Sequence, residues 1–257
     1  CSGQGIDAGR WRERPYRAPH HTASAVALIG GGSHPRPGEI SLAHNGVLFL
    51  DELPEWSRHA LEVMREPIES GVAVVSRAAR TERFPARFQL VAAMNPCPCG
   101  WAGDRSGRCL CAEEVIRRYR GRVSGPLMDR IDLHVEVPRL DPRELRDDAP
   151  LGEDSASVRA RVVAAREVQL LRSGKANAHL LPFELSAHCR LSEEDQQLLE
   201  DAVERLQLSA RSMHRILRVA RTLADLGHAQ DIATAHVAEA IGYRQLDRGG
   251  SGLGKTP

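Results

Sequence analysis

The pattern of hydrophobic and polar positions differs between the two halves of this chain. In the first half, apolar residues form short, nearly uninterrupted runs at 46–50 and 88–94. Such runs favour strands that are buried on both faces, as in a parallel sheet covered by helices. Beyond residue 155, apolar residues recur at helical spacing instead. The pattern therefore predicts an α/β half followed by an all-α bundle.

The same pattern predicts most of the remaining elements. Those of the first half are a helix at 55–65 that Pro67 ends, a β-hairpin at 71–84, a basic helix at 113–122 and a half-buried alternating strand at 131–137. Those of the second half are helices at 155–172, 192–206, 209–226 and 235–243, the second of which a capping box opens at Ser192. Residues 15–45 are rich in Gly, Pro and His, which predicts loops.

Composition divides the chain further. The charged stretch 139–154 contains Pro142 and Pro150, and we interpret it as a linker between an α/β core at 15–138 and a helical domain at 155–246. Residues 1–14 are interpreted as the end of an upstream segment, and 247–257 as a flexible tail. Because the first residue is Cys1 instead of Met, we expect further sequence upstream.

Charge and cysteine usage narrow the class of protein. The formal net charge is +1, so any nucleic-acid surface must be a local one. No apolar run is long enough to cross a membrane, and no signal-peptide pattern opens the sequence. Four of the six cysteines fall within residues 97–111. This crowding favours a metal site in the reducing cytoplasm over the disulfides of a secreted protein.

Polar residues follow both buried runs. Asp51 and Glu52 come directly after the first run, and Asn95 follows the second. Ligands of open α/β sheets bind beyond the carboxyl ends of the strands. There, Asp51 would hold the Mg²⁺ of a nucleotide, Glu52 would polarise the attacking water, and Asn95 would hydrogen-bond the water and the terminal phosphate. The alternatives are carboxylates that begin a helix and a turn-forming Asn before Pro96.

The cysteines form two C-x-C pairs, Cys97 with Cys99 and Cys109 with Cys111, joined by a glycine-containing loop. Four thiolates of this kind could surround one tetrahedral Zn²⁺. The single residue inside each pair is fewer than the two to four that are usual in zinc sites. Reduced thiols and disulfides therefore remain as alternatives.

Two further patterns concern phosphate binding. Arg77 and Arg80 lie at the predicted hairpin tip, where they could contact nucleic-acid phosphates or only form a solvated turn. Residues 249–256 fit the phosphate-loop pattern G-x-x-x-x-G-K-[ST], but no strand is predicted before them and no helix after them. We interpret them as tail. The pair His20–His21 has no Cys or His at ligand spacing, so no metal site is predicted there.

Together, these motifs resemble those of the magnesium-chelatase-like AAA+ ATPases of the ComM/YifB branch. The resemblance covers residues 14 to 246 and rests on the segments 16–21, 46–55, 84–100 and 124–137. It implies a Walker B pair at Asp51–Glu52, a sensor-1 residue at Asn95, an arginine finger at Arg130 and a sensor-2 arginine at Arg211 in a helical lid.

The resemblance also implies an activity. Members of this branch are hexameric motors that hydrolyse ATP with Mg²⁺ at subunit interfaces and act on DNA, in branch migration during natural transformation. Their phosphate loop and N-terminal Lon-like domain would lie upstream of Cys1, so residues 1–257 alone are expected not to hydrolyse ATP. One alternative is a chelatase-like subunit that remodels a protein partner for metal insertion. Another is a non-catalytic zinc-binding module.

Overall fold

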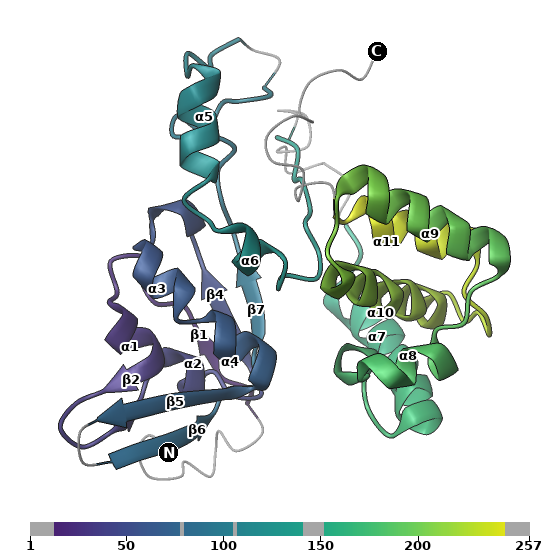
Figure 1. Ribbon diagram of the computed structural model, residues 1–257, viewed down its shortest axis with the longest axis horizontal. Coiled ribbons are helices and arrows are strands. Elements are labelled where there is room, and N and C mark those ends of the chain that lie inside the picture. Colours follow the sequence, from purple (N-terminus) through teal and green to yellow (C-terminus); the bar gives the residue numbers. More distant parts are fainter. Residues whose placement is uncertain (1–12, 78–79, 105–106, 141–151, 245–257) are drawn as a thin grey trace. The chain divides into compact units, whose positions relative to one another are not determined.

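The computed structural model describes residues 13–77, 80–104, 107–140 and 152–244 (Figure 1). Two compact units make up the chain, Cys1–Ile131 and Asp132–Lys255. Most of the predicted linker, the predicted tail and the phosphate-loop-like stretch 249–256 lie outside the described residues. Among the described residues, no helix combines the length and the apolar composition that crossing a membrane requires.

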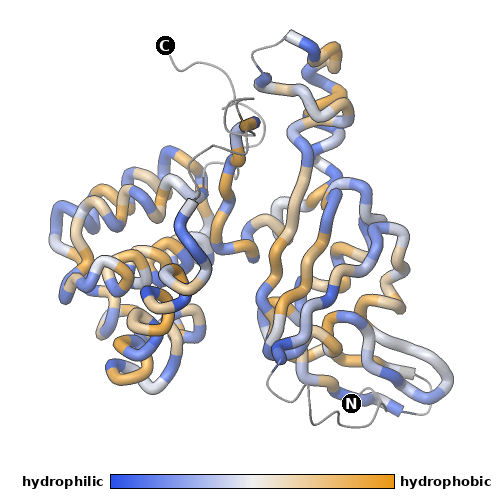
Figure 2. Tube along the Cα trace, turned by 180° about the vertical axis from the view of Figure 1, so that it is seen from behind, coloured by the Kyte–Doolittle hydropathy of each residue, from blue (hydrophilic) through white to orange (hydrophobic). Residues whose placement is uncertain are grey.

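The first unit contains a parallel sheet of three strands in the order β1-β4-β7, which are Tyr16–Arg17, Val47–Leu50 and Gln89–Ala92. Leu48 and Leu50, on one face of β4, are fully buried, whereas Val47 and Phe49, on the other face, are half-buried. The apolar run therefore correctly predicts a core strand, but its burial is complete on one face only. Figure 2 shows that hydrophobic residues continue along the strands of this sheet.

The strand β7 departs from its prediction. Leu90 packs against the hydrophobic core, but the next residue, Val91, is 40% exposed. Successive side chains of a strand point to opposite faces of the sheet. Only the face of β7 that carries Leu90 is covered by the core, so the expectation of burial on both faces is wrong for this outer strand.

The first unit also contains short helices. They are α1 Ala25–Ile29, α2 Glu39–Leu42, the 3₁₀ helix η2 Leu53–Glu55, α3 Arg58–Glu62, α4 Arg65–Ser70, α5 Glu113–Arg120 and α6 Gly125–Met128. Leu28 of α1, Ile40 of α2 and Leu61 of α3 share one core with β4. The loops predicted for residues 15–45 therefore contain two helices and the two-stranded ribbon β2 Gly30–Gly31 with β3 Arg36–Pro37.

The single helix predicted at 55–65 is wrong, because η2, α3 and α4 occupy this region. Ser57 caps α3 by accepting a hydrogen bond from the amide of Ala60, at 3.2 Å. Pro67 lies in the first turn of α4, where a backbone N–H has no partner within the helix, so proline is tolerated there instead of ending a helix. The predicted hairpin is confirmed as β5 Val72–Arg77 and β6 Arg80–Pro85.

The strand predicted at 131–137 is absent. These residues pair with no other strand among the described ones, and Val135 and Val137 are 60% and 83% exposed. The amide of His134 instead donates to the carbonyl of Tyr243, at 2.9 Å. Alternation of apolar and polar residues predicts a strand only where a sheet edge is present to pair with it.

The second unit is helical, as predicted. Its helices are α7 Ser155–Ser173, η3 Asn177–His179, α8 Pro182–His188, α9 Glu193–Leu206, α10 Ala210–Leu226 and α11 Thr234–Gly242. Ser192 caps α9 by accepting from the amide of Asp195, at 3.1 Å. The core contains Leu199 of α9, Ile216 of α10 and Val237 of α11.

A buried ionic cluster joins α7, η3 and α10. The Asp225 side chain is fully buried and accepts two hydrogen bonds from Arg172, both at 2.7 Å, and one from Asn177, at 2.8 Å. Arg221 donates to the same carboxylate, at 3.1 Å. Burial by itself raises the pKa of Asp225, but the hydrogen bonds from Arg172 and Asn177 outweigh it and hold the pKa below its usual value.

Asp225→Ala is expected to lower the free energy of unfolding by about 3–5 kcal/mol, because removing one partner leaves buried arginine charge uncompensated. The exposed Asp201→Ala is the matched control, and both are compared by chemical denaturation. Since folding lowers the pKa of Asp225, its stabilisation is complete at neutral pH and is lost as the pH falls below about 4. The two variants should therefore become similar in acid. Equal stability at pH 7 would contradict this assignment.

Candidate functional site

The parallel sheet brings polar residues that follow two neighbouring strands to one edge. Asp51 and Glu52 follow β4, and Asn95 lies three residues beyond β7. Leu50 and Ala92 are register partners, and backbone pairing continues past them: Ala93 N donates to the carbonyl of Leu50 at 2.9 Å. The structure therefore places Asp51, Glu52 and the segment that carries Asn95 beside one another.

The turn after β4 fixes the two carboxylates differently. Asp51 is exposed, and its Oδ1 accepts from the amide of Glu52 at 2.8 Å. Its carbonyl accepts from the Trp56 indole N–H at 3.0 Å. The described part of the chain offers no hydrogen-bond partner to Oδ2 of Asp51, which is therefore open to a cation. Glu52 has φ of 50°, a left-handed conformation that is uncommon for residues other than glycine and clusters at functional sites.

Glu52 has a partner that the sequence did not indicate. The Nδ1 atom of His21 lies 2.9 Å from Oε2 of Glu52, and the rings of His20 and His21 have centroids 4.1 Å apart. His21 reaches this position because β1 runs parallel to β4 and ends at the same edge of the sheet. A strand of two residues produces no detectable pattern, so the signal for this contact is absent from the sequence.

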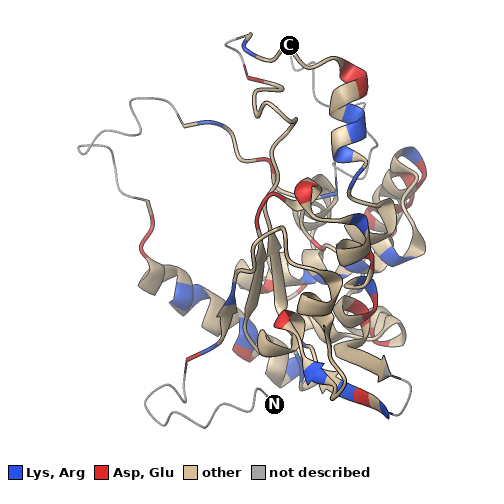
Figure 3. Cartoon of the chain, turned by 90° about the vertical axis from the view of Figure 1, so that its left-hand side faces the viewer, with Lys and Arg blue, Asp and Glu red and all other residues tan. Residues whose placement is uncertain are grey.

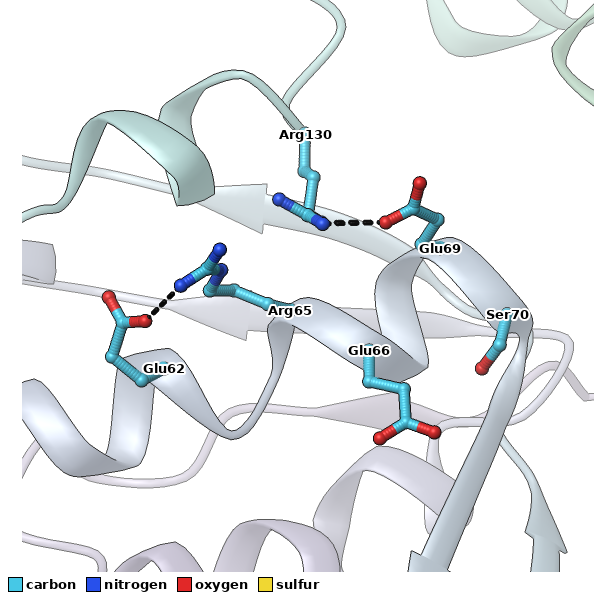
Figure 4. Close-up of a pocket in the computed structure, with 6 residues that line it drawn as sticks. All are labelled: Glu62, Arg65, Glu66, Glu69, Ser70 and Arg130. Carbon is cyan, nitrogen blue, oxygen red and sulfur yellow. Dashed lines mark hydrogen bonds and ion pairs between the residues drawn. The ribbon is translucent and has the colours of Figure 1, made fainter. Parts of the chain in front are cut away.

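The predicted finger, Arg130, follows α6 and contributes to a pocket lined by Glu62, Arg65, Glu66, Glu69 and Ser70 (Figure 4). Its side chain is only 10% exposed. Nε and Nη2 donate to Oε2 of Glu69, at 3.1 and 2.6 Å, and Nη1 donates to the carbonyl of Pro126, at 2.7 Å. The neighbouring Arg65 is paired with Glu62. The guanidinium of Arg130 is thus held by its own chain, through Glu69, which the sequence did not reveal.

The remaining predicted arginines lie elsewhere. Arg211 is exposed in the first turn of α10, in the helical unit, where Ser209 caps the helix. Arg77 ends β5 and Arg80 begins β6, and the two are cross-strand partners. Residues 78–79 between them lie outside the described residues.

The four clustered cysteines come together. One Sγ atom from each of Cys97, Cys99, Cys109 and Cys111 lies within 4.8 Å of all the others. The distance is 3.3 Å from Cys97 to Cys99, 3.8 Å from Cys97 to Cys109 and 3.7 Å from Cys99 to Cys109. A tetrahedral Zn²⁺ with Zn–S bonds of 2.3 Å would place its sulfur ligands roughly 3.8 Å apart. The donor set and its spacing therefore fit this metal.

The thiols of the cluster differ in their environments. All four are free of disulfides. Burial raises the pKa of Cys97, but hydrogen bonds from Cys99 and from the amides of Ala102 and Trp101 outweigh it and lower the pKa to about 6. The hydrogen bond with Cys99 raises the pKa of Cys111 to about 11. The cluster thus favours a thiolate at its buried end.

A parallel sheet whose middle strand ends in two carboxylates, flanked by polar residues at the same edge, is typical of nucleotide-binding α/β proteins. The family of magnesium chelatase, subunit ChlI, matches residues 1–145, and the ChlI C-terminal family matches residues 152–244. The chain belongs to this magnesium chelatase family. It combines part of an AAA+ core, formed by the parallel sheet and its helices, with a helical C-terminal region.

Individual relatives agree with the ComM/YifB resemblance, which is confirmed. The chain is 52% identical over 238 residues to competence protein ComM of Haemophilus influenzae, covering 93% of this chain and 46% of that protein. It is 50% identical over 239 residues to YifB of Salmonella typhimurium, covering 93% and 47%. Subunit ChlI of Porphyra purpurea is 29% identical over 120 residues, 47% of this chain and 28% of that protein. The chain spans about half the length of the ComM and YifB relatives.

Proposed function

We propose that the full-length protein is a ring-shaped, ATP-hydrolysing motor that acts on DNA, with branch migration as its form of work. The observation that carries the ATPase proposal is the position of Asp51 and Glu52 at the carboxyl end of β4, beside the segment after β7. The DNA substrate is supported by the 52% identity to a competence protein.

The residues at the sheet edge fit a nucleotide with its metal, because Asp51 offers an exposed carboxylate oxygen to a hard cation. Bound Mg-ATP would supply the reacting phosphoryl group and the charge of the metal. Asp51 would hold the hydrated Mg²⁺. Glu52 would leave His21 to polarise the attacking water, and Asn95 would orient that water.

The ring follows from the proposed roles of the arginines. Arg130 would act on the nucleotide of a neighbouring subunit, and Arg211 would meet the nucleotide from the helical unit. Arginine suits both roles because its planar fork pairs with phosphate oxygens. We propose a hexamer located in the cytoplasm. Residues 1–257 alone are expected to hydrolyse ATP poorly, because their described part contains no phosphate loop.

The test uses the full-length protein. ATP hydrolysis is expected to require Mg²⁺ and to be stimulated by DNA, with branched DNA compared against linear duplex. The alternative is a chelatase-like subunit that remodels a protein partner, which the 29% identity to ChlI favours. Turnover without any stimulation by DNA would favour this alternative. Absence of Mg²⁺-dependent turnover under both conditions would contradict the ATPase proposal itself.

We further propose that the cysteine cluster holds Zn²⁺. Protein purified without chelator is expected to contain about one zinc per chain, because four thiol sulfurs are already gathered at ligand spacing. Cys109→Ser should lose the metal. Cys189→Ser is the matched control, because this buried cysteine lies in the helical unit and outside the cluster. Elemental analysis that finds no zinc in the wild-type protein would favour reduced thiols.

A further inference from the structure

The chain leaves the sheet edge through the cysteine cluster and returns to it through α5. Cys97 lies two residues after Asn95, and Cys111 lies two residues before α5 begins at Glu113. The helix projects beyond the end of β7 (Figure 1). The cluster therefore connects one strand end to a helix that runs back toward the same edge.

At the carboxyl end of α5, two arginines contact the backbone that follows the site residues. Nε of Arg120 donates to the carbonyl of Pro96, at 2.9 Å. Nη1 of Arg122 donates to Oε2 of Glu55, at 2.8 Å, and to the carbonyl of Pro54, at 3.3 Å. Pro96 directly follows Asn95, and Pro54 and Glu55 belong to the η2 turn that follows Glu52. One short segment thus holds both strand ends.

Tyr119, directly before Arg120 in the sequence, is buried beside Arg122. It is 5% exposed, and the Arg122 guanidinium lies 5.9 Å from its ring centroid. Burial raises the pKa of Tyr119, and the negative charges of Glu55 and Glu52 raise it further. The phenol therefore lies within the electrostatic field of the proposed catalytic carboxylate.

The rest of α5 is not built into the core. Tyr119 is its only buried residue. Figure 3 shows acidic residues at the start of this helix and basic residues farther along it. Arg118 pairs with Glu114 of the same helix, and both side chains are about three-quarters exposed. The Arg122–Glu55 pair is also solvent-exposed, and exposed ion pairs add little to stability. These contacts are therefore better suited to setting a position than to stabilising the fold.

We propose that residues 119–122 form a brace through which the cysteine cluster sets the position of Asn95 relative to Glu52. The proposal rests on the ATPase function and on the zinc site proposed above, and it makes Arg120 and Arg122 positioning residues. A metal bound to both cysteine pairs fixes the two ends of the loop 97–111 against each other. The Cys97 end of the loop directly follows Pro96, and the Cys111 end leads into α5. The metal therefore also fixes the angle at which α5 returns to the sheet edge.

Coupling of this kind is reciprocal. If metal at the cluster favours the positions of Asn95 and Glu52 that bind nucleotide, then bound nucleotide must tighten the hold on the metal by the same factor. Loss of the brace should therefore change two measurements, the turnover of ATP and the rate at which zinc leaves the cluster.

The first arm measures turnover of the zinc-loaded, full-length protein. Arg120→Ala and Arg122→Ala are expected to lower kcat about tenfold, because small displacements of reacting groups are costly. The affinity of the zinc-loaded variants for a non-hydrolysable nucleotide should weaken only by the several-fold coupling factor, which is smaller than the loss of kcat, and the zinc content should stay at the wild-type value. Arg118→Ala is the matched control on the same helix and should behave as wild type. The exchange Glu55→Arg with Arg122→Glu should restore part of the lost kcat, because it rebuilds the ion pair with reversed polarity.

The second arm does not depend on activity. Zinc release to a chelator is followed with a colorimetric indicator, with and without the non-hydrolysable nucleotide. Nucleotide should slow release several-fold in wild type and in Arg118→Ala, and much less in Arg120→Ala and Arg122→Ala. If the wild type turns over but both brace variants match Arg118→Ala in kcat and in release, the brace is overturned. A wild type without turnover contradicts the proposed ATPase and leaves zinc release as the test of the brace. In that case, the brace is overturned if nucleotide slows zinc release from Arg120→Ala and Arg122→Ala as much as from Arg118→Ala.

Discussion

Glu52→Gln in the full-length protein is expected to retain ATP binding and ring assembly but to hydrolyse ATP about 10²–10⁴-fold more slowly, the range for loss of a positioned general base. The amide keeps the shape of the side chain but lacks the negative charge that polarises water. Steady-state turnover, binding of a fluorescent nucleotide and the mass of the assembly in solution are the three measurements. Only the first is expected to change.

The matched control is Glu114→Gln, which makes the same chemical change on the exposed part of α5. It should leave turnover, binding and assembly as in wild type. The side-chain amide introduced by Glu52→Gln can still hydrogen-bond to His21 and keep the turn in place. A loss of turnover in this variant would therefore report the missing negative charge and not a displaced turn. If Glu52→Gln turned over ATP within a few-fold of the control, Glu52 would have no catalytic role and would only be the residue at which η2 begins.

The sequence predicts the elements whose signals are local. The helices α9 and α10 follow from apolar spacing over several turns, and α9 also from the cap at Ser192; these features act within the element itself. The strand β4 follows from its unbroken apolar run. The segment 131–137 has an equally clear alternation, but a strand needs a partner, and a partner is a property of the tertiary fold.

The same distinction applies to the candidate site. The nearness of Asp51, Glu52 and Asn95 follows from the sequence, because two buried runs predict parallel strands whose ends meet at one edge. The cysteine cluster follows from close spacing along the chain. The contacts of His21 with Glu52, of Glu69 with Arg130 and of Arg122 with Glu55 do not follow, because each joins residues 31 to 67 positions apart without any periodic signal.

Arg130→Ala is expected to lower hydrolysis by about 10³–10⁵-fold, the range known for arginine fingers, because charge that develops on the transferred phosphoryl group is no longer neutralised. Nucleotide binding and ring assembly should persist. Arg65→Ala is the matched control, because it removes the same charge from the same pocket and Arg65 is paired with Glu62. Equal turnover of the two variants would mean that Arg130 has only a structural role in this pocket, as the ion-pair partner of Glu69.

The position of Arg130 makes a further test possible. A finger has to leave Glu69 and the Pro126 carbonyl to reach a phosphate, and it acts on the nucleotide of the neighbouring subunit. Rings of Glu52→Gln alone and rings of Arg130→Ala alone should both be inactive. Mixed rings should regain turnover, because some interfaces then join an intact Glu52 on one subunit to an intact Arg130 on the next. Mixtures of Glu52→Gln with the double variant Glu52→Gln/Arg130→Ala contain no such interface and should stay inactive. A nucleotide-bound ring in which Arg130 remained on Glu69, with Asp51 at the metal, would show that the finger is a different residue.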